Sequence, residues 1–411
     1  MSAQVRQIEG GITAPEGFLA AGVEAAVKYP DRKDMALVYS TAPCRVAGTF
    51  TSNVVKAAPV LWDKEIVERS EFAQAVVVNT GIANAGTGEQ GRKNCRFVAE
   101  HAGKVLGLPA SAVLVCSTGV IAAQLPTDRL AAGIEKLAKA KAAGPQAGED
   151  AAKAIMTTDT VHKQIAVQVE IGGRTITLGG MCKGSGMIHP NMCTMLGFVT
   201  TDANISKEML QKALSADVTD SFNMISVDGD TSTNDTLLLL ANGLAGNAEI
   251  TAEGEDYDAF CEALRRVTTY LARRMAGDGE GATALLECHV IGAEDKAAAR
   301  TLAKSVIGSS LTKAAIFGHD ANWGRILCAL GYSGTQFDPE NVDIYFESSD
   351  GRIHVCHKGI ACDYSEEAAT KILSAPEVTV TCDMHMGSGE AVAWGCDLSY
   401  DYVKINADYR S

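Results

Sequence analysis

Thr194 is the residue whose type and position suggest the most distinctive chemistry in this 411-residue sequence. It follows a glycine-punctuated loop, Lys183-Gly184-Ser185-Gly186, and a turn signal at Pro190-Asn191. Residues 195–199 then form an apolar run that is typical of a buried strand. A hydroxyl at such a junction can be held from one side and approached from the other. Spacing alone, however, favours an ordinary threonine at the start of a strand.

A reactive threonine at this position could cut the chain in front of itself. The Thr194 hydroxyl would attack the carbonyl of Cys193, an N-to-O acyl shift would form an ester, and water would hydrolyse that ester. The freed α-amine of Thr194 has an ordinary pKa of roughly 7.7–8.0, so it could serve as general base for its own hydroxyl. One residue would then supply both nucleophile and base.

Composition describes an acidic globular protein. The net charge of −14 argues against nucleic acid or an anionic membrane as a partner. Hydrophobic residues make up 46% of the chain, which is ample for a core, and the length suggests two or three domains. No signal peptide or membrane-length apolar stretch is recognisable, and the twelve cysteines are scattered as in proteins with reduced thiols. We expect a cytoplasmic protein.

Strands, hairpins and long helices are mixed along the chain, which predicts an α/β or α+β fold of packed layers. Two short strands, 37–40 and 46–50, are expected around a turn at Pro43. Hairpins are expected where strand patterns flank Gly172-Gly173 and Asp350-Gly351. The longest amphipathic helix is expected to end at Gly277 and to bury Phe260, Leu264, Val267, Leu271 and Met275.

The best candidate for a metal site is the group His354, Cys356 and His357. Strict alternation along a strand would divide these three residues between two faces, so we expect no metal site there. Three acidic residues also crowd residues 228–235, but their spacing differs from that of a calcium loop. That run is interpreted as a buried polar turn.

The run Lys-Gly-Ser-Gly-Met-Ile-His-Pro-Asn-Met-Cys-Thr-Met-Leu, residues 183–196, resembles the signature of the ornithine acetyltransferase family, the glutamate N-acetyltransferases of arginine biosynthesis. The family usually has alanine where this chain has Cys193, and both residues are small. The C-terminal run 405–411, Ile-Asn-Ala-Asp-Tyr-Arg-Ser, resembles the family's ending. The resemblance extends from about residue 50 to the C-terminus.

The resemblance implies two sheets packed between helices, arranged like the threonine-nucleophile hydrolases. It also implies self-cleavage between Cys193 and Thr194. The products would be an α chain, residues 1–193, and a β chain, residues 194–411, which stay together in one fold. Two copies of each would form a heterotetramer.

Thr118 and Gly119 are the candidate oxyanion-stabilising pair. The apolar strand 113–116 runs directly into them, and a strand ending this way leaves backbone N–H groups and a hydroxyl available as donors. A plain strand-to-helix turn would give the same pattern. The resemblance assigns the pair to the oxyanion hole.

The resemblance also implies substrate-binding residues. Glu280 would bind the substrate's amino group and Lys183 its carboxylate or the developing charge. One of two adjacent threonines would contact the substrate, and two C-terminal residues would reach it. The two threonines are Thr157 and Thr158, and the two C-terminal residues are Asn406 and Ser411.

The function implied is ping-pong transfer of acetyl from N-acetylornithine to glutamate through an acetyl-Thr194 ester. Neither a metal nor an organic cofactor is required, and the sequence leaves open whether acetyl-coenzyme A is a second donor. Two alternatives remain open: an autoprocessed amidase or aminopeptidase of a related fold, and an uncleaved binding or sensor protein.

Overall fold

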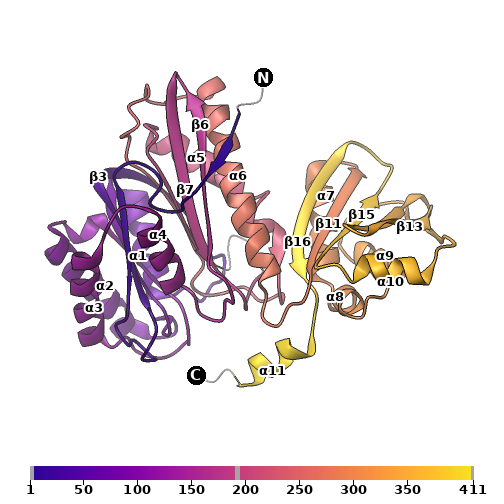
Figure 1. Cartoon of the computed structure of the whole chain (residues 1–411), viewed down its shortest axis with the longest axis horizontal. Helices are drawn as coiled ribbons and strands as arrows, with labels where there is room; N and C mark the ends of the chain where they lie inside the picture. The colour runs from indigo at the N-terminus through magenta and orange to yellow at the C-terminus, as the bar shows by residue number, and fades with distance from the viewer. Residues whose placement is uncertain (1–3, 190–194, 409–411) are drawn as a thin grey trace.

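The computed structural model describes residues 4–189 and 195–408. Within them the chain forms two β-sheets with helices packed on both (Figure 1). Except for β9, the segments up to α6 build the first sheet and its helices, and most of the later segments build the second. This arrangement confirms the expected layered α/β fold class.

The first sheet has nine strands in the order β1-β6-β7-β8-β10-β3-β4-β5, with β2 paired to β3. β8 and β10 run parallel at its centre and are buried along their whole length, as their unbroken apolar sequences predict. The hairpin expected around Gly172-Gly173 is confirmed as β6 and β7. The strands are β1 (Arg6–Ile8), β2 (Phe18–Val23), β3 (Met35–Phe50), β4 (Ala73–Asn79), β5 (Val113–Ser117), β6 (Lys163–Ile171), β7 (Arg174–Lys183), β8 (Leu196–Thr201) and β10 (Thr236–Ala241).

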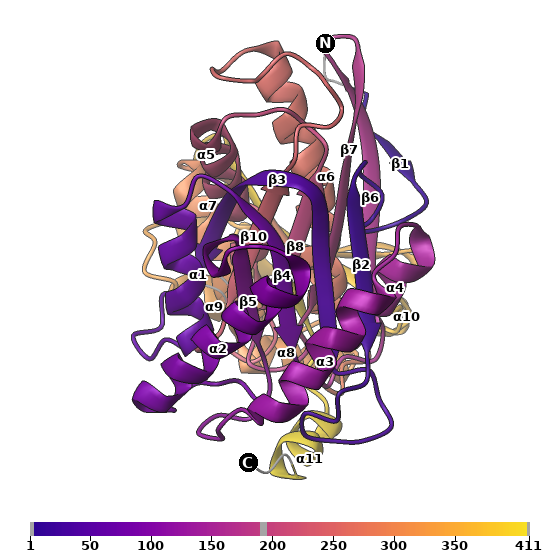
Figure 2. The ribbon, with the colours of Figure 1, turned by 90° about the vertical axis from the view of Figure 1, so that its left-hand side faces the viewer.

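Six α-helices pack against the first sheet. Figure 2 shows α2 and α3 lying together on one face, where α2 packs on β5 and α3 packs on β2 and β3 around one apolar layer. α6 packs against β6 and β7 and ends at Gly277, as expected. The helices are α1 (Ala58–Arg69), α2 (Gly88–Leu106), α3 (Thr127–Ala140), α4 (Pro145–Ala154), α5 (Lys207–Val218) and α6 (Glu255–Gly277).

The expected turn at Pro43 was wrong, because β3 is a single strand of 16 residues. Its first half pairs with β2 and β4, and its second half pairs with β10. These distant partners keep the chain extended through Pro43. The proline lies where the β3–β4 register shifts, between Tyr39 and Cys44, so its missing N–H costs little.

The second sheet has seven strands in the order β14-β13-β12-β15-β11-β16-β9. The strands are β9 (Ile225–Ser226), β11 (Leu285–Ala293), β12 (Asp343–Ser348), β13 (Gly351–His357), β14 (Ile360–Ala361), β15 (Glu377–Asp383) and β16 (Gly389–Cys396). The remaining helices are α7 (Lys296–Gly308), α8 (Ser310–Phe317), α9 (Trp323–Gly331), α10 (Glu366–Leu373) and α11 (Tyr400–Asp408). Three short 3₁₀ helices are η1 (Ala110–Ala112), η2 (Phe222–Met224) and η3 (Pro339–Asn341).

The expected hairpin around Asp350-Gly351 is confirmed as β12 and β13, but it contains a bulge. Ile344 faces Cys356 while the next residue, Tyr345, faces His354, so Val355 is an extra residue in β13. The extra residue interrupts strict alternation. Val355 and Cys356 are both fully buried, and the histidines on either side of them are partly or largely exposed. The expectation that alternation separates His354 from His357 was therefore wrong.

The two sheets share one apolar core, which continues from α6 into the strands and helices of the second sheet. α7 covers β11 and β16, and α6 also contacts β16. After β16 the chain turns back, so that α11 lies below the gap between the two sheets (Figure 1). Among the helices described, none combines the length and apolar character needed to cross a lipid bilayer.

Candidate active site

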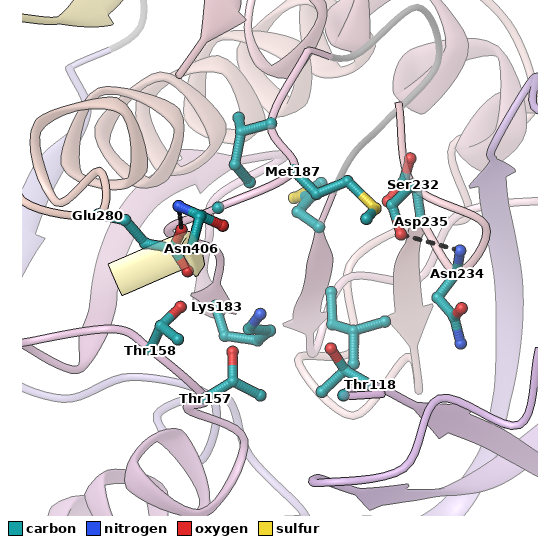
Figure 3. A pocket seen from close by; sticks show the side chains of 15 residues that line it. Thr118, Thr157, Thr158, Lys183, Met187, Ser232, Asn234, Asp235, Glu280 and Asn406 are labelled. Carbon is teal, nitrogen blue, oxygen red and sulfur yellow. Dashed lines mark hydrogen bonds between the residues drawn. The ribbon is translucent and has the colours of Figure 1, made fainter. Parts of the chain in front are cut away.

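A pocket lies where β5 and β7 end and β8 and β10 begin. Its walls come from segments far apart in the sequence, and opposite walls face each other across an open centre (Figure 3). The space among the lining atoms, together with the open solvent at its mouth, is about 700 Å³. The lining residues are Thr118, Gly119, Thr157, Thr158, Lys183, Gly186, Met187, Ile188, Met195, Leu196, Ser232, Asn234, Asp235, Glu280 and Asn406.

The sheet register places the two flanks of the central motif at this pocket. Lys183, the last residue of β7, pairs with Leu196, the first residue of β8. Met195 and Ile188 also line the pocket. The predicted cleavage residues Cys193 and Thr194 lie outside the described residues, as does the predicted binder Ser411.

The glycine-rich loop after β7 is held by the acidic run that was interpreted as a polar turn. The Asp228 carboxylate accepts hydrogen bonds from the backbone N–H groups of Met187, at 2.6 Å, and Ile188, at 2.8 Å. Met187 has a φ of 56°, a left-handed conformation that costs free energy in a residue other than glycine. Asp228 therefore stabilises a strained loop conformation at the edge of the pocket.

Two buried lysines and two buried aspartates form a charge-balanced cluster beside the pocket. They are Lys163, Lys183, Asp159 and Asp278. Lys163 Nζ lies 2.8 Å from Asp159 Oδ1 and 2.5 Å from Asp278 Oδ2, and its side chain has no exposed surface. Asp159 Oδ2 lies 4.0 Å from Lys183 Nζ. The other oxygen of the same carboxylate, Asp159 Oδ1, accepts a hydrogen bond from the Gly184 N–H. The cluster therefore connects α6, β6 and β7 and fixes the end of β7 in the pocket.

Burial and the neighbouring charges shift the pKa values of this cluster in opposite directions. Burial alone raises the pKa of Asp159, but the ammonium groups of Lys183 and Lys163 outweigh it and hold that pKa below its ordinary value. Burial lowers the pKa of Lys183, and Asp159 only partly opposes the shift. Burial also acts to lower the pKa of Lys163, yet its carboxylate partners hold that pKa above the ordinary value. Lys183 is thus the cation of the cluster that most readily gives up its proton.

Glu280 and Asn406 form one end of the pocket. Asn406 Nδ2, on α11, donates a hydrogen bond of 2.8 Å to Glu280 Oε2 (Figure 3). The Glu280 carboxylate is largely buried and the Glu280 N–H donates to the Ser185 carbonyl, so backbone contacts fix its position. The structure thereby brings the C-terminal helix to the loop after α6.

Thr118 and Gly119 line the side of the pocket opposite Glu280 and Asn406. The structure corrects one of the hydrogen-bond donors expected for the oxyanion. The Thr118 N–H is not free, because it donates to the Asn79 carbonyl as the β4–β5 ladder continues one residue past β5. The donors left for an oxyanion are the Thr118 hydroxyl and the Gly119 N–H. Gly119 has a φ of 130°, and a Cβ there would lie 2.2 Å from the carbonyl carbon of Gly81, so this position requires glycine.

Thr157 and Thr158 both line the pocket, so its geometry does not select one of them (Figure 3). They follow α4 in a turn in which the Asp159 carboxylate accepts a hydrogen bond from the Thr157 N–H, at 3.0 Å. The charge cluster therefore also positions this turn.

Three polar lining residues outside the 183–196 motif were not assigned to the site from the sequence: Ser232, Asn234 and Asp235. Asn234 Nδ2 donates to the carbonyls of Ala83, at 2.6 Å, and Ser117, at 2.8 Å. It thus connects the 226–236 loop to the end of β5. Polar residues clustered just before the buried strand β10 were the available signal, because such strand ends often carry functional groups.

Comparison with known proteins decides the family. Residues 19–411 match the model of the ArgJ family. The arginine biosynthesis bifunctional protein ArgJ of Symbiobacterium thermophilum is 53% identical over 406 residues, covering 98% of this chain and 99% of that protein. The chain belongs to the ArgJ family. The protein of the same name from Thermotoga neapolitana is 50% identical over 398 residues, with 97% of this chain and 99% of that protein covered.

A solved ArgJ structure, the arginine biosynthesis bifunctional protein from Bacillus halodurans, is 49% identical with a TM-score of 0.50. The match covers 100% of that solved chain but only 53% of this one. ArgJ membership confirms the resemblance recognised in the motif of residues 183–196.

Proposed function

We propose that this ArgJ-family enzyme of arginine biosynthesis transfers the acetyl group of N-acetylornithine to glutamate by a ping-pong reaction at Thr194. The observation that carries the proposal is the convergence of seven residues on one pocket in a chain that matches the family over residues 19–411. The seven come from five separate segments: Thr118, Gly119, Thr157, Thr158, Lys183, Glu280 and Asn406.

The nucleophile would be prepared by self-cleavage. The Thr194 hydroxyl attacks the Cys193 carbonyl, and the peptide C–N bond breaks as an ester forms, which frees the Thr194 amine. Water then hydrolyses the ester to a Cys193 carboxylate and the free Thr194 hydroxyl. This step rests on the sequence. One comparison supports it: the solved chain from Bacillus halodurans spans 53% of this chain, the share that residues 194–411 represent.

In the transfer reaction, Thr194 Oγ attacks the acetyl carbonyl and the Thr194 amine takes the hydroxyl proton. The Thr118 hydroxyl and the Gly119 N–H donate hydrogen bonds to the oxyanion. Ornithine leaves with the returned proton, and an acetyl-Thr194 ester remains. The amine of glutamate then attacks this ester, which releases N-acetylglutamate and restores the Thr194 hydroxyl.

Substrate recognition would use the charges at two sides of the pocket. The Glu280 carboxylate binds the substrate's ammonium group, and Asn406 fixes the orientation of that carboxylate through its 2.8 Å hydrogen bond. Lys183, supported by Asp159, binds the carboxylate common to ornithine and glutamate. The hydroxyls of Thr157 and Thr158 contribute polar contacts, and Ser411 would reach the substrate from the C-terminus.

Replacing Gly186 by alanine should weaken substrate binding through Glu280. A Cβ at Gly186 would lie 2.4 Å from Glu280 Oε2, so the flexible carboxylate must move away from its present position. A hydrogen bond to a charged group contributes about 1.5–3 kcal/mol, so we expect KM for N-acetylornithine to rise about 10- to 100-fold. Steady-state kinetics measures this.

Gly331→Ala is the matched control for this substitution. No atom lies within 4 Å of a Cβ at Gly331, so KM should stay at the wild-type value. An unchanged KM in Gly186→Ala would remove Glu280 from the binding site.

Assembly and location follow the same proposal. We infer that the α and β chains stay associated and form a heterotetramer in the cytoplasm. The eleven cysteines within the described residues are all free thiols, which agrees with a reducing compartment. The proposed chemistry calls on no cofactor, and acetyl-coenzyme A is a candidate second acetyl donor.

The deciding experiment separates transfer from hydrolysis. Purified protein is supplied with N-acetylornithine, with and without glutamate, and N-acetylglutamate, ornithine and acetate are quantified. We expect N-acetylglutamate in amounts equal to ornithine, with little acetate. Release of acetate independent of glutamate would instead identify an amidase. No turnover from an uncleaved chain would indicate a binding protein.

A further inference from the structure

Three metal-ligating side chains, Asp343, His354 and His357, converge in the second sheet on β12 and β13, and His385, in the turn after β15, contacts Asp343. His357 Nδ1 lies 3.0 Å from Asp343 Oδ1, and His385 Nε2 lies 3.1 Å from Asp343 Oδ2. His354 Nε2 lies 3.9 Å from Asp343 Oδ1. One ligand atom each from Asp343, His354 and His357 lies within 4.8 Å of the other two.

The β-bulge at Val355 creates this convergence. It lets His354 and His357 share one face of β13, while Val355 and Cys356 fill the core. His354 also stacks on Tyr345, its cross-strand partner, with ring centroids 4.3 Å apart. Bulges often redirect side chains at functional positions, and here the redirected residues are imidazoles.

A second layer of contacts orients these ligands. His385 Nδ1 lies 3.4 Å from Asp383 Oδ1, which leaves His385 Nε2 directed at Asp343. The Lys358 N–H donates a 2.8 Å hydrogen bond to Asp343 Oδ1. A carboxylate behind a histidine and a hydrogen-bonded ligand carboxylate are the usual outer contacts of protein metal sites.

Backbone strain and an unpaired nitrogen accompany the cluster. Lys358 and His385 both have a φ of 49°, in the left-handed region that costs non-glycine residues free energy. His354 Nε2 is shielded from solvent and has no hydrogen-bond partner within the described part of the chain. A buried polar atom left unpaired is destabilising, and a bound metal would remove that cost.

We propose that Asp343, His354 and His357 bind one Zn²⁺ ion, with His385 available to complete a four-ligand shell. Imidazole nitrogens with one carboxylate form a typical tetrahedral zinc set. Bonds of roughly 2.0–2.1 Å at tetrahedral angles place ligand atoms about 3.4 Å apart. Measured to Asp343 Oδ1, the 3.0 Å contact of His357 needs only a slight widening and the 3.9 Å contact of His354 a slight approach. His385 contacts the other oxygen, Oδ2, at 3.1 Å.

The site is structural in kind. It joins β12, β13 and the turn after β15, and its residues are separate from those that line the acetyl-transfer pocket. Its expected effect is to stabilise the second sheet, so its test does not depend on the proposed function.

The experiment measures Zn²⁺ binding to the full chain after chelator treatment and dialysis. Isothermal titration calorimetry and metal analysis should give one Zn²⁺ per chain, and Zn²⁺ should raise Tm. His354→Gln should weaken binding at least about 10-fold and abolish the Tm increase. This variant should fold, because the nitrogen it removes makes no hydrogen bond within the described chain. Co²⁺ should give an intense visible absorption band with wild type and none with His354→Gln.

His289→Gln is the matched control. His289 also lies in the second sheet, where its Nε2 contacts Glu390 at 2.7 Å, and it should leave Zn²⁺ binding unchanged. Less than one ion per five chains in wild type would overturn the proposal. Wild-type affinity in both His354→Gln and Asp343→Asn would overturn it as well, because the ion would then bind elsewhere.

Discussion

Thr194→Ala should yield a single uncleaved polypeptide of 43.1 kDa and should abolish acetyl transfer. Without the hydroxyl, neither the ester needed for cleavage nor the acetyl-enzyme can form. Removing the nucleophile of a covalent mechanism lowers kcat by several orders of magnitude, so we expect a loss of at least about 10⁴-fold. Intact-mass analysis and N-terminal sequencing report cleavage, and the acetyl-transfer assay reports turnover.

Thr194→Ser is the control, because it keeps a hydroxyl at the same position. It should still be cleaved, more slowly, and should retain measurable transfer. A Thr194→Ala protein that splits between the same residues would contradict the self-cleavage proposal. One that remains whole but transfers acetyl at the wild-type rate would contradict the acetyl-threonine intermediate.

Lys163→Met should be among the most destabilising single substitutions in the first sheet. The methionine side chain fills a similar volume, but Asp159 and Asp278 lose the ammonium group that lies 2.8 and 2.5 Å from them. Breaking a buried ion pair by removing one partner costs about 3–5 kcal/mol. Urea denaturation of wild type and variant, compared in the same processing state, measures the free energy of unfolding.

Lys153→Met serves as the surface control, because Lys153 is exposed and its partner, the partly exposed Glu149, lies one turn away on α4. It should leave the urea midpoint almost unchanged. A Lys163→Met midpoint equal to that of Lys153→Met would show that the buried cluster contributes no stability.

The loss of stability in Lys163→Met, measured as the free energy of unfolding, should also depend on pH. In wild type the pKa of Asp159 is held below its ordinary value, so as pH falls the unfolded chain takes up this proton first. The stabilisation is complete above a pH of about 3.9 and is lost as pH falls toward the folded pKa. In the variant Asp159 has lost one neighbouring cation and therefore has less stabilisation to lose. The difference in free energy of unfolding between wild type and Lys163→Met should therefore become smaller below about pH 4.

The sequence by itself determined the family and singled out seven residues that line one pocket. The motif of residues 183–196 pointed to the ornithine acetyltransferases before any fold was known, and the family match confirmed it. The hairpin at Gly172-Gly173 and the helix ending at Gly277 were predictable because turn residues and apolar spacing act over a few neighbouring residues. The family resemblance assigned most of the seven predicted site residues that line one pocket, and local spacing alone did not single them out.

Only the tertiary structure decided which distant groups meet. The ion pairs of Lys163 with Asp159 and Asp278, the contact of Asn234 with Ser117, and the continuity of β3 through Pro43 all depend on partners remote in sequence. The bulge at Val355 reversed the expected separation of His354 and His357, because pairing with β12 adds a residue that local alternation cannot show. Periodicity is a property of neighbours along the chain, whereas register and burial are set by packing between elements.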